Sequence, residues 1–463
     1  MIREERCEIT ERYSVLPPYS LLQIGALLRE QGHDVSLIDA NGDNLDYHRL
    51  SAKLESPQYD ALVFRFTPTT FDHDMKTAVL SKKLHPHAVT IGICWTLHSL
   101  PEQVIAGVPE LDVYVRHEYE TVTPQLIDAL DGNTSLADVT GIAYRTGERI
   151  AVTEDAAPVD DYDSLPIPAY DLLACFDNYF INTPAGKPFT IMYTSKGCPY
   201  GCTFCTVART KWKKRNAAGI LEELRYLREN YGIKTVSFFD ETFTIDRRRV
   251  LDIARGISYN DLEVKWYCNT RVELVDKGLL ATMYRGGCRG VSFGVESGSQ
   301  SVLDKAEKGS TIEQAEHAIL WAKKAGIKVY CSFIMGLPCE TWDTVRETID
   351  FVRRTLPTGA QFNVATPYPG TKLFESVYGA KAESSADWRS LYQYQAVAGT
   401  DALSPEDLDR VRMMAYRSLY FNPRWWLQNI RHVVRHPEDF EMAAKYVIKI
   451  VDNYLIHRMR HGH

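Results

Sequence analysis

Residues 194–205 read TSKGCPYGCTFC, and they govern the interpretation of the whole chain. Three cysteines stand there in the spacing Cys-x3-Cys-x2-Cys, at Cys198, Cys202 and Cys205. Three thiolates on one short loop can hold three corners of a cubane iron–sulfur cluster and leave the remaining iron without a protein ligand. A closed structural zinc site needs another Cys or His nearby, and the loop contains none. The pattern therefore predicts a cluster with one open iron, with unligated or zinc-bound cysteines as the alternative.

The composition limits the possible classes of protein. The chain has 463 residues, with 53 Lys+Arg against 60 Asp+Glu and a net charge of −7. A mildly acidic chain argues against broad nucleic-acid binding, which needs a basic surface. No apolar run reaches the ~18 residues of a membrane helix, and the polar N-terminus has no apolar signal core. We therefore expect a cytoplasmic protein with no membrane span, no nucleic-acid partner and reduced cysteines.

The first part of the chain alternates short apolar runs with helical patterns. An amphipathic helix is expected over 21–31, ended by Gly32. This alternation predicts a parallel, doubly wound sheet that binds ligands beyond the carboxyl ends of its strands. The segment 141–185, rich in Asp and Pro, is typical of a linker. The strands expected in this part are 35–38, 61–64, 89–91 and 112–115.

A second series of strands and helices follows the linker. Its regular alternation predicts a partial (β/α)6 barrel, whose chemistry lies on the loops after the strands. A helix with one apolar face is expected over 220–229, and a capping box at Ser310–Glu313 predicts another helix start. The six expected strands are 189–193, 235–239, 265–268, 291–296, 328–334 and 361–365.

The C-terminal part changes to helical spacing, most clearly over 405–420 and 440–456. Its tryptophans, among them Trp388, Trp425 and Trp426, are expected to pack in a core. The fold class is therefore α/β, with a Rossmann-like N-terminal domain, a partial (β/α)6 barrel and a helical C-terminal domain. The corresponding ranges are 1–140, 141–185 for the linker, 186–375 and 376–463.

The cysteine spacing, with the aromatic Phe204 before the last cysteine, resembles the cluster signature of the radical S-adenosylmethionine (SAM) superfamily. The resemblance covers roughly residues 186–375. It implies a [4Fe-4S] cluster on Cys198, Cys202 and Cys205, with SAM at the open iron. It also implies a 5′-deoxyadenosyl radical, which removes hydrogen from unactivated carbon atoms.

The same resemblance implies where SAM is held. After the second strand, Asp240 and Glu241 would bind the SAM ammonium group, which carboxylates suit. Arg271 would lie near the SAM carboxylate, and Phe204 would flank the cluster.

Later stations of the superfamily are present as well. Glu296 would accept hydrogen bonds from the ribose hydroxyls, assisted by Ser297. Ile334 would pack on the adenine. The family usually has glycine where Cys339 stands.

The N-terminal part resembles the cobalamin-binding domain that precedes the barrel in many radical SAM methylases. The matching pieces are 16–28, 32–39, 67–70 and 115–120, and they imply that cobalamin is a cofactor. The usual Asp-x-His-x-x-Gly motif is absent, so no axial histidine comes from it. The alternative is a relict domain that only packs on the barrel. The implied cobalamin contacts are Pro18, Tyr19, Ser20, Thr67, Thr69, Thr70, Gly92 and Glu118, whereas His33 and His117 are expected not to bind a metal.

With both cofactors the resemblance implies a C-methyltransferase. It would move a methyl group from methylcobalamin to an sp3 carbon, after the 5′-deoxyadenosyl radical has removed a hydrogen atom. The substrate would be a peptide or protein Cα, such as a residue of methyl-coenzyme M reductase, or a small molecule. An electron donor such as flavodoxin or ferredoxin would be needed.

Three other functions stay open at this point. One is a cobalamin-linked cyclase or rearrangement enzyme that acts on a small molecule. Another is a methylthiotransferase, which carries a further cluster on upstream cysteines such as Cys7, Cys94 and Cys175. The third is a non-catalytic iron–sulfur carrier or cobalamin-loading protein. The basic run Lys211–Arg215 would either begin a solvated helix or bind an anionic group or peptide.

Overall fold

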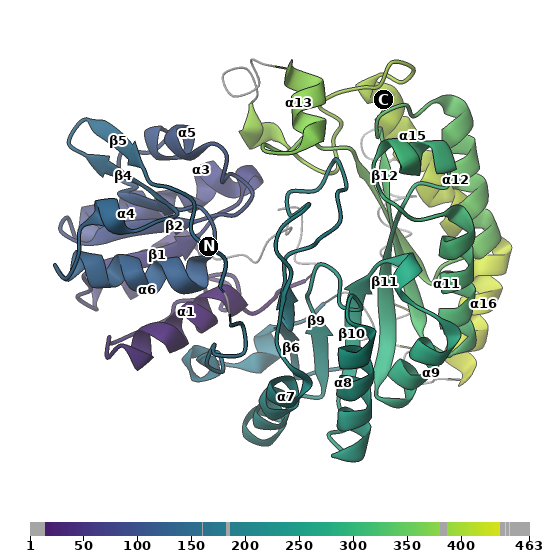
Figure 1. The fold of residues 1–463 in the computed structure, drawn as a ribbon, viewed down its shortest axis with the longest axis horizontal. Coiled ribbons are helices and arrows are strands. Elements are labelled where there is room, and N and C mark those ends of the chain that lie inside the picture. The colour runs from purple at the N-terminus through teal and green to yellow at the C-terminus, as the bar shows by residue number, and fades with distance from the viewer. Residues whose placement is uncertain are drawn as a thin grey trace. The chain divides into compact units, whose positions relative to one another are not determined.

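The fold is known from a computed structural model that describes residues 14–159, 161–181, 186–379 and 387–435, with Phe440 and Ala444 (Figure 1). The chain forms two compact units, each made of several segments. The N-terminal unit contains Met1–Tyr179, Phe204–Arg215 and Pro367–Tyr392. The barrel unit contains Phe180–Thr203, Asn216–Thr366 and Gln393–His463. Phe204–Arg215 and Pro367–Tyr392 thus belong to the N-terminal unit, whereas the domains expected from the sequence were continuous ranges.

The N-terminal unit is built on a sheet with the strand order β1-β2-β3-β4-β5. The first three strands are parallel, as the alternating pattern predicts, and the last two are antiparallel. The strands are β1 (Ala61–Arg65), β2 (Val89–Ile93), β3 (Val113–Val115), β4 (Ile142–Thr146) and β5 (Arg149–Val152). The main helices are α1 (Tyr19–Glu30), α2 (Tyr47–Glu55), α3 (Phe71–Asp74), α4 (Lys76–Leu84), α5 (Pro101–Ala106), α6 (Tyr119–Leu130) and α13 (Lys372–Tyr378), with 3-10 turns η1 (Pro68–Thr70), η2 (Leu136–Asp138), η3 (Tyr170–Leu172), η4 (Phe176–Asn178) and η7 (Trp388–Ser390).

Two expectations for this unit are corrected. The segment after residue 140 begins not as a linker but as the hairpin β4–β5, which turns at Gly147 with φ 63° and extends the sheet. The strand expected over 35–38 does not form. Val35 and Leu37 instead pack on the main core, and Ile38 packs on a second cluster around Leu50. Alternating apolar residues can therefore serve two cores without pairing in a sheet.

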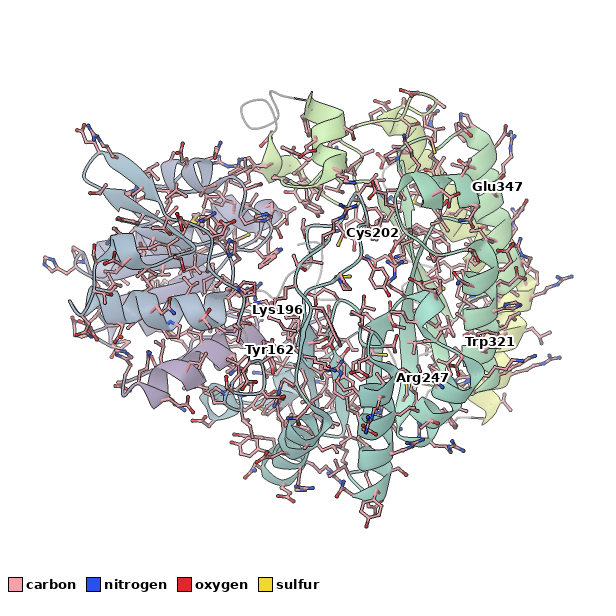
Figure 2. All side chains as sticks on the ribbon, viewed as in Figure 1. Tyr162, Lys196, Cys202, Arg247, Trp321 and Glu347 are labelled. Atoms are coloured by element: carbon pink, nitrogen blue, oxygen red, sulfur yellow. The ribbon has the colours of Figure 1, made fainter. Side chains whose placement is uncertain are left out.

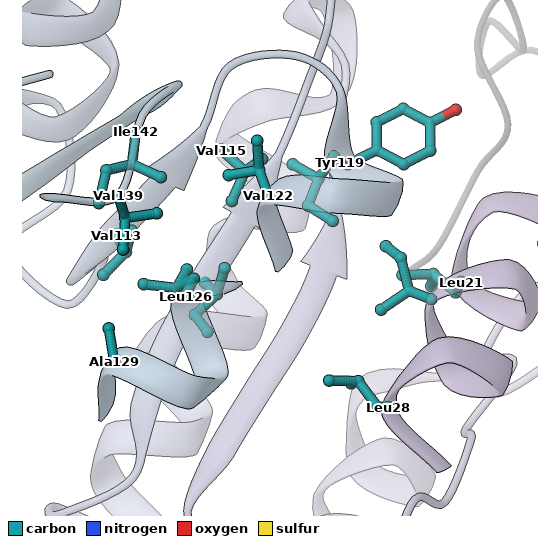
Figure 3. Packing of buried hydrophobic residues seen from close by; sticks show 13 residues of the cluster. Leu21, Leu28, Val113, Val115, Tyr119, Val122, Leu126, Ala129, Val139 and Ile142 are labelled. Atoms are coloured by element: carbon teal, nitrogen blue, oxygen red, sulfur yellow. The ribbon is translucent and has the colours of Figure 1, made fainter. Parts of the chain in front are cut away.

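The main core of the N-terminal unit lies between the sheet, α1 and α6 (Figure 3). Leu21 and Leu28 reach it from α1, and Leu126 comes from α6 with no exposed surface. Burying one such leucine contributes about 1.5–3 kcal/mol.

The barrel unit has a six-stranded sheet with the order β13-β12-β11-β10-β9-β6, and every neighbouring pair is parallel. All six strands expected from the sequence are present. Among the described residues β6 and β13 do not pair, so the barrel is partial. The strands are β6 (Phe189–Met192), β9 (Thr235–Phe238), β10 (Lys265–Thr270), β11 (Cys288–Glu296), β12 (Lys328–Met335) and β13 (Gly359–Val364). The helices are α7 (Ala217–Tyr231), α8 (Arg247–Tyr259), α9 (Lys277–Arg285), α10 (Gln300–Lys305), α11 (Ile312–Lys324) and α12 (Trp342–Thr355), with the turn η5 (Val272–Leu274).

The helix starts lie within three residues of the expected positions: α1 begins at Tyr19 instead of residue 21, and α7 begins at Ala217 instead of residue 220. The capping box of α11 is formed by Thr311 and Gln314, one residue later than expected. The C-terminal part forms α15 (Pro405–Tyr420) and α16 (Pro423–Arg435). Trp388 and Trp425 are buried, which confirms their packing role. The helix expected over 440–456 lies outside the described residues apart from two isolated positions.

Candidate radical SAM site

The three cysteines lie on one loop that leaves the barrel sheet after β6. The loop passes through the short strand β7 (Ser195–Lys196) and turns at Gly197, whose φ is 86°. Cys198 and Cys202 are buried, Cys205 is half-buried, and all three are thiols rather than disulfides. Figure 2 labels Cys202 on this loop, beyond the strand ends. The predicted cluster loop therefore stands at the edge of the barrel where such folds carry their chemistry.

A backbone hydrogen bond fastens the loop to the barrel. The amide of Thr203 donates to the carbonyl of Ala306 at 3.0 Å. Burial raises the pKa of the Cys198 thiol, and the backbone amide of Tyr200 and the Thr242 hydroxyl partly oppose this. Cysteines bind metals as thiolates, so binding a cluster would release protons here.

Arg271 places a positive charge against this loop. It follows β10, and its Nη1 lies 3.5 Å from the Cys202 sulfur, while its guanidinium stands 3.8 Å above the centre of the Tyr200 ring. Its other donors go to the Glu273 carboxylate and the Lys308 carbonyl. Arg271 was expected at the SAM carboxylate. In the structure it first stabilises the cysteine loop, and its role toward SAM stays a prediction.

Asp240 is occupied within the chain. Its Oδ1 accepts from the Thr194 amide at 2.7 Å, and its Oδ2 accepts from the hydroxyls of Thr194 and Ser195, both at 2.6 Å. Arg249 pairs with the same carboxylate at 3.5 Å and donates to the Thr194 carbonyl at 2.7 Å. Asp240 has no exposed surface. It therefore anchors the start of the cysteine loop, and the half-buried Glu241 is the better candidate for the SAM ammonium.

Glu296 ends β11 in a strained conformation beside a lysine that sequence reasoning missed. Its φ is 68°, and the register with β12 shifts between Gly294 and Glu296. The Lys308 Nζ lies 2.8 Å from its Oε1, and both side chains are more than nine-tenths buried. Strained residues held by their surroundings often mark functional sites. Nothing local distinguishes Lys308 among the 53 Lys and Arg residues, since only the fold brings it to Glu296.

Ser297 has a different environment from Glu296. Its hydroxyl lies 3.2 Å from that of Thr348 and accepts from the Ser299 amide at the same distance. It has no exposed surface. Ser297 therefore fixes the turn after β11, and a contact with SAM stays a prediction.

One face of the barrel sheet is only half-buried, and its residues line up across neighbouring strands. Asn269 on β10 pairs with Ser292 on β11, and Ile334 on β12 pairs with Asn363 on β13. Paired residues of parallel strands point to the same face. All four are half-buried, whereas Phe333 on the opposite face has no exposed surface. Ile334, the expected adenine contact, therefore belongs to the accessible face.

The loop after β12 explains why the family usually has glycine at position 339. Cys339 has φ 67°, a conformation that disfavours side chains with a Cβ. The next residue, Glu340, accepts from the Gly336 amide and is almost fully buried. Burial raises the pKa of Glu340 to about 7.

The residues predicted to contact cobalamin gather at the carboxyl edge of the N-terminal sheet. The Thr67 hydroxyl lies 2.8 Å from that of Thr70 and 3.2 Å from that of Thr69, in the turn η1 after β1. The Ser20 hydroxyl, at the start of α1, donates to Tyr119 at 3.1 Å. Pro18 is the buried residue before α1, and Tyr19 packs edge-on against Tyr170. The edge is therefore rich in small hydroxyl groups, of which Thr69 is half-buried.

Two residues of that predicted set have structural roles within the N-terminal unit. A Cβ at Gly92 would lie 2.9 Å from the Phe66 ring, so glycine is needed there for packing. Glu118, with φ 52°, pairs with Lys213 at 2.5 Å, and both side chains are buried. The solvated helix considered for 211–215 is therefore wrong: Lys213 and Arg215 are buried, and β8 (Lys213–Lys214) precedes α7.

Comparison with known proteins agrees with this geometry. The model of the radical SAM superfamily matches residues 192–352. An uncharacterised methyltransferase of Pyrococcus horikoshii is 30% identical over 417 residues, which is 89% of this chain and 90% of that protein. The chain belongs to the radical SAM superfamily. This radical SAM protein is also 30% identical over 419 residues to the anaerobic magnesium-protoporphyrin IX monomethyl ester cyclase of Rubrivivax gelatinosus, covering 88% of this chain and 74% of the cyclase.

Solved structures share the fold of this radical SAM protein. The methyltransferase TsrM from Kitasatospora setae, solved with cobalamin and a [4Fe-4S] cluster, has a TM-score of 0.71 at 16% identity, covering 89% of this chain and 87% of TsrM. The cobalamin-dependent radical SAM enzyme OxsB has a TM-score of 0.64 at 21% identity, covering 81% of this chain and 54% of OxsB. These likenesses show the fold. Within the described part of the chain, no helix has both the length and the apolar character needed to cross a bilayer.

Proposed function

We propose that this chain is a cobalamin-dependent radical SAM methyltransferase that acts on an unactivated sp3 carbon. The observation that carries the proposal is the loop of Cys198, Cys202 and Cys205 at the carboxyl edge of the partial barrel, with Arg271 against it. Near full-length similarity to a protein named as a methyltransferase supports the reaction class.

The residues present fit a [4Fe-4S] cluster. Three thiols in one loop match the donor type that such clusters take. The Arg271 guanidinium, 3.5 Å from the Cys202 sulfur, would offset the negative charge of the thiolates. When bound, the cluster and SAM supply a radical able to take hydrogen from a non-acidic carbon, and cobalamin supplies the methyl group. An electron donor such as flavodoxin or ferredoxin would be required.

The remaining work of the chain is to position SAM and exclude water. Glu296 is held by Lys308, so its carboxylate is oriented before a ribose hydroxyl arrives. Glu241 is proposed to accept from the SAM ammonium, and Ile334 offers an apolar surface on the accessible face of the sheet. Arg271 and Lys308 are both buried. Their charges therefore act more strongly than they would in water, because the protein interior screens them less.

The N-terminal unit is proposed to bind cobalamin. The fit rests on the hydroxyl groups of Ser20, Thr67 and Thr69 at the edge where parallel sheets bind ligands. A buried hydroxyl at the same edge, that of Ser99, has no hydrogen-bond partner among the described residues. Hydroxyl groups suit the amide-rich rim of a corrin. This arrangement argues against a relict domain that only packs.

The substrate is proposed to be a carbon of a peptide or protein, such as the Cα of a residue in methyl-coenzyme M reductase. A second candidate is a small molecule, because TsrM has been solved with tryptophan as its substrate. The similarity to the magnesium-protoporphyrin cyclase favours a further alternative, in which the same cofactors close a ring. The mass of the product distinguishes methylation from ring closure, because only methylation replaces a hydrogen atom by a methyl group.

A methylthiotransferase would need a second cluster on upstream cysteines. Cys94 is buried and Cys175 is exposed, and Cys7 lies outside the described residues. We therefore give the methyltransferase precedence.

The test is anaerobic reconstitution with iron, sulfide and cobalamin, followed by SAM and a reductant. We expect cubane absorbance, retained cobalamin and formation of 5′-deoxyadenosine. Replacing Cys198, Cys202 and Cys205 by Ala should abolish the absorbance and the product, whereas Cys175→Ala, an exposed cysteine outside the loop, should change neither. Intact 5′-deoxyadenosine formation in the triple variant would refute the assignment.

A further inference from the structure

The last cysteine of the cluster loop begins a short segment that is folded on itself. Cys205 lies in Phe204–Arg215, which belongs to the N-terminal unit. Its carbonyl accepts a hydrogen bond from the Ala208 amide at 3.2 Å. The Val207 carbonyl accepts another from the Thr210 hydroxyl at 2.8 Å. Because these bonds hold the segment together, the place of the Cys205 thiol depends on how the N-terminal unit holds the segment.

Trp95 holds the segment next to Cys205. It follows β2, and its indole Nε1 donates to the Thr206 carbonyl at 3.3 Å. The Trp95 ring packs against the rings of His98 and His117, whose centres both lie 5.8 Å from its own. An indole has a single donor, so this bond and the packing of the ring together fix its orientation. The anchor is therefore braced by the loops after two adjacent strands, β2 and β3.

Glu118 holds the segment near its other end, through Lys213. The Lys213 Nζ lies 2.5 Å from the Glu118 Oε2, and the two side chains are only 4% and 8% exposed. The Val159 amide also donates to this oxygen, at 3.5 Å. Removing either charge would leave the other uncompensated in the interior. The segment is thus fastened both at Thr206 and at Lys213.

The backbone of Glu118 is held against its local preference. Its φ of 52° lies in the left-handed region, which disfavours residues other than glycine. Strain of this kind persists where the surrounding structure fixes it, and it is common at functional sites. A buried ion pair adds little net stability, since apolar side chains of similar size often do as well. The stability of the N-terminal unit alone therefore does not account for this anchor.

Metal ligands depend on the residues that hold them from behind. Changes in such supporting residues weaken metal binding even when every ligand is present. We propose that Trp95 and Glu118 are positioning residues for Cys205, the third thiolate of the cluster. The first acts through Thr206 and the second through Lys213. This inference rests on the cluster of the proposed function and does not require cobalamin.

The test is the release of iron from the anaerobically reconstituted full chain to the chelator bathophenanthroline. Trp95→Phe keeps an aromatic ring and removes the donor, and Lys213→Met removes the charge at similar length. Each should speed iron release at least about tenfold. Each should also shift the electron paramagnetic resonance g values of the dithionite-reduced cluster. Lys82→Met is the matched control, because it breaks the 2.6 Å pair with Asp112 in the same unit, and it should change neither readout.

Each outcome is decisive. Unchanged iron release in either Trp95→Phe or Lys213→Met overturns the inference and leaves the proposed function standing. Equally fast release from Lys82→Met also overturns it, because the loss of any ion pair in the unit would then suffice. An unmodified chain that assembles no cluster overturns both. If Lys213→Met does not fold, the result in Trp95→Phe decides, since that variant leaves the buried ion pair intact.

Discussion

Asp240 should act on the stability of the cysteine loop and not directly on SAM. Its carboxylate is fully buried and accepts from Thr194 and Ser195, and Arg249 pairs with it. In Asp240→Asn the buried guanidinium keeps its charge without a counter-charge. Breaking such a buried pair costs about 3–5 kcal/mol. For a unit of this size, that predicts a fall of roughly 6–20 °C in melting temperature.

The assay is thermal unfolding of the metal-free protein followed by circular dichroism, with SAM binding to the reconstituted protein measured by calorimetry. Glu241→Gln is the matched comparison, because it removes the neighbouring carboxylate. We expect Asp240→Asn to lower the melting temperature and Glu241→Gln mainly to weaken SAM binding. An unchanged melting temperature in Asp240→Asn, together with weaker SAM binding, would refute the reasoning.

Three further predictions concern the barrel unit. Arg271→Met should lower the reduction potential of the cluster in a redox titration, because it removes a positive charge 3.5 Å from the Cys202 sulfur; an unchanged potential would contradict this. Burial raises the pKa of Glu340 to about 7 against an ordinary 4.5, so stability should fall as pH rises between these values, because the unfolded chain gives up its proton first. This pKa difference corresponds to about 3 kcal/mol of unfolding free energy. In denaturation curves at pH 5 and pH 8, Glu340→Gln should lose this pH dependence while still accepting the hydrogen bond from the Gly336 amide. The same pH dependence in both proteins would contradict the prediction. Cys339→Gly should raise the free energy of unfolding by about 1 kcal/mol, since φ is 67° there, whereas Cys339→Ala should not.

Lys308 offers a separate test of the ribose site. Lys308→Met should leave the buried Glu296 carboxylate without its partner, at a cost of about 3–5 kcal/mol, and should weaken SAM binding in calorimetry. Lys305→Met, at the exposed end of α10, is the control and should change neither quantity. Normal SAM affinity in a folded Lys308→Met protein would show that Glu296 does not need its lysine.

Local patterns in the sequence predicted most of the architecture. Each barrel strand is a short apolar run with a helix after it. Barrel strands that follow one another along the chain also lie next to one another in the sheet, so the strand order could be inferred without tertiary information. The cysteine trio was equally visible, because its spacing is a property of one loop. The hairpin at 142–152 was missed, since polar flanks and a glycine turn resemble a linker.

The sequence by itself determined which chemical groups stand at which strand end: three thiols in the loop after β6, a pair of acids after β9, and a glutamate at the end of β11. Only the tertiary structure decided what each group does. It turned Asp240 inward to Arg249, brought Lys308 to Glu296, and set Trp95 beside Thr206. These partners are separated by 9, 12 and 111 positions along the chain (249 − 240, 308 − 296, 206 − 95). Hydrogen bonds and ion pairs depend on distance in space, which local patterns do not carry.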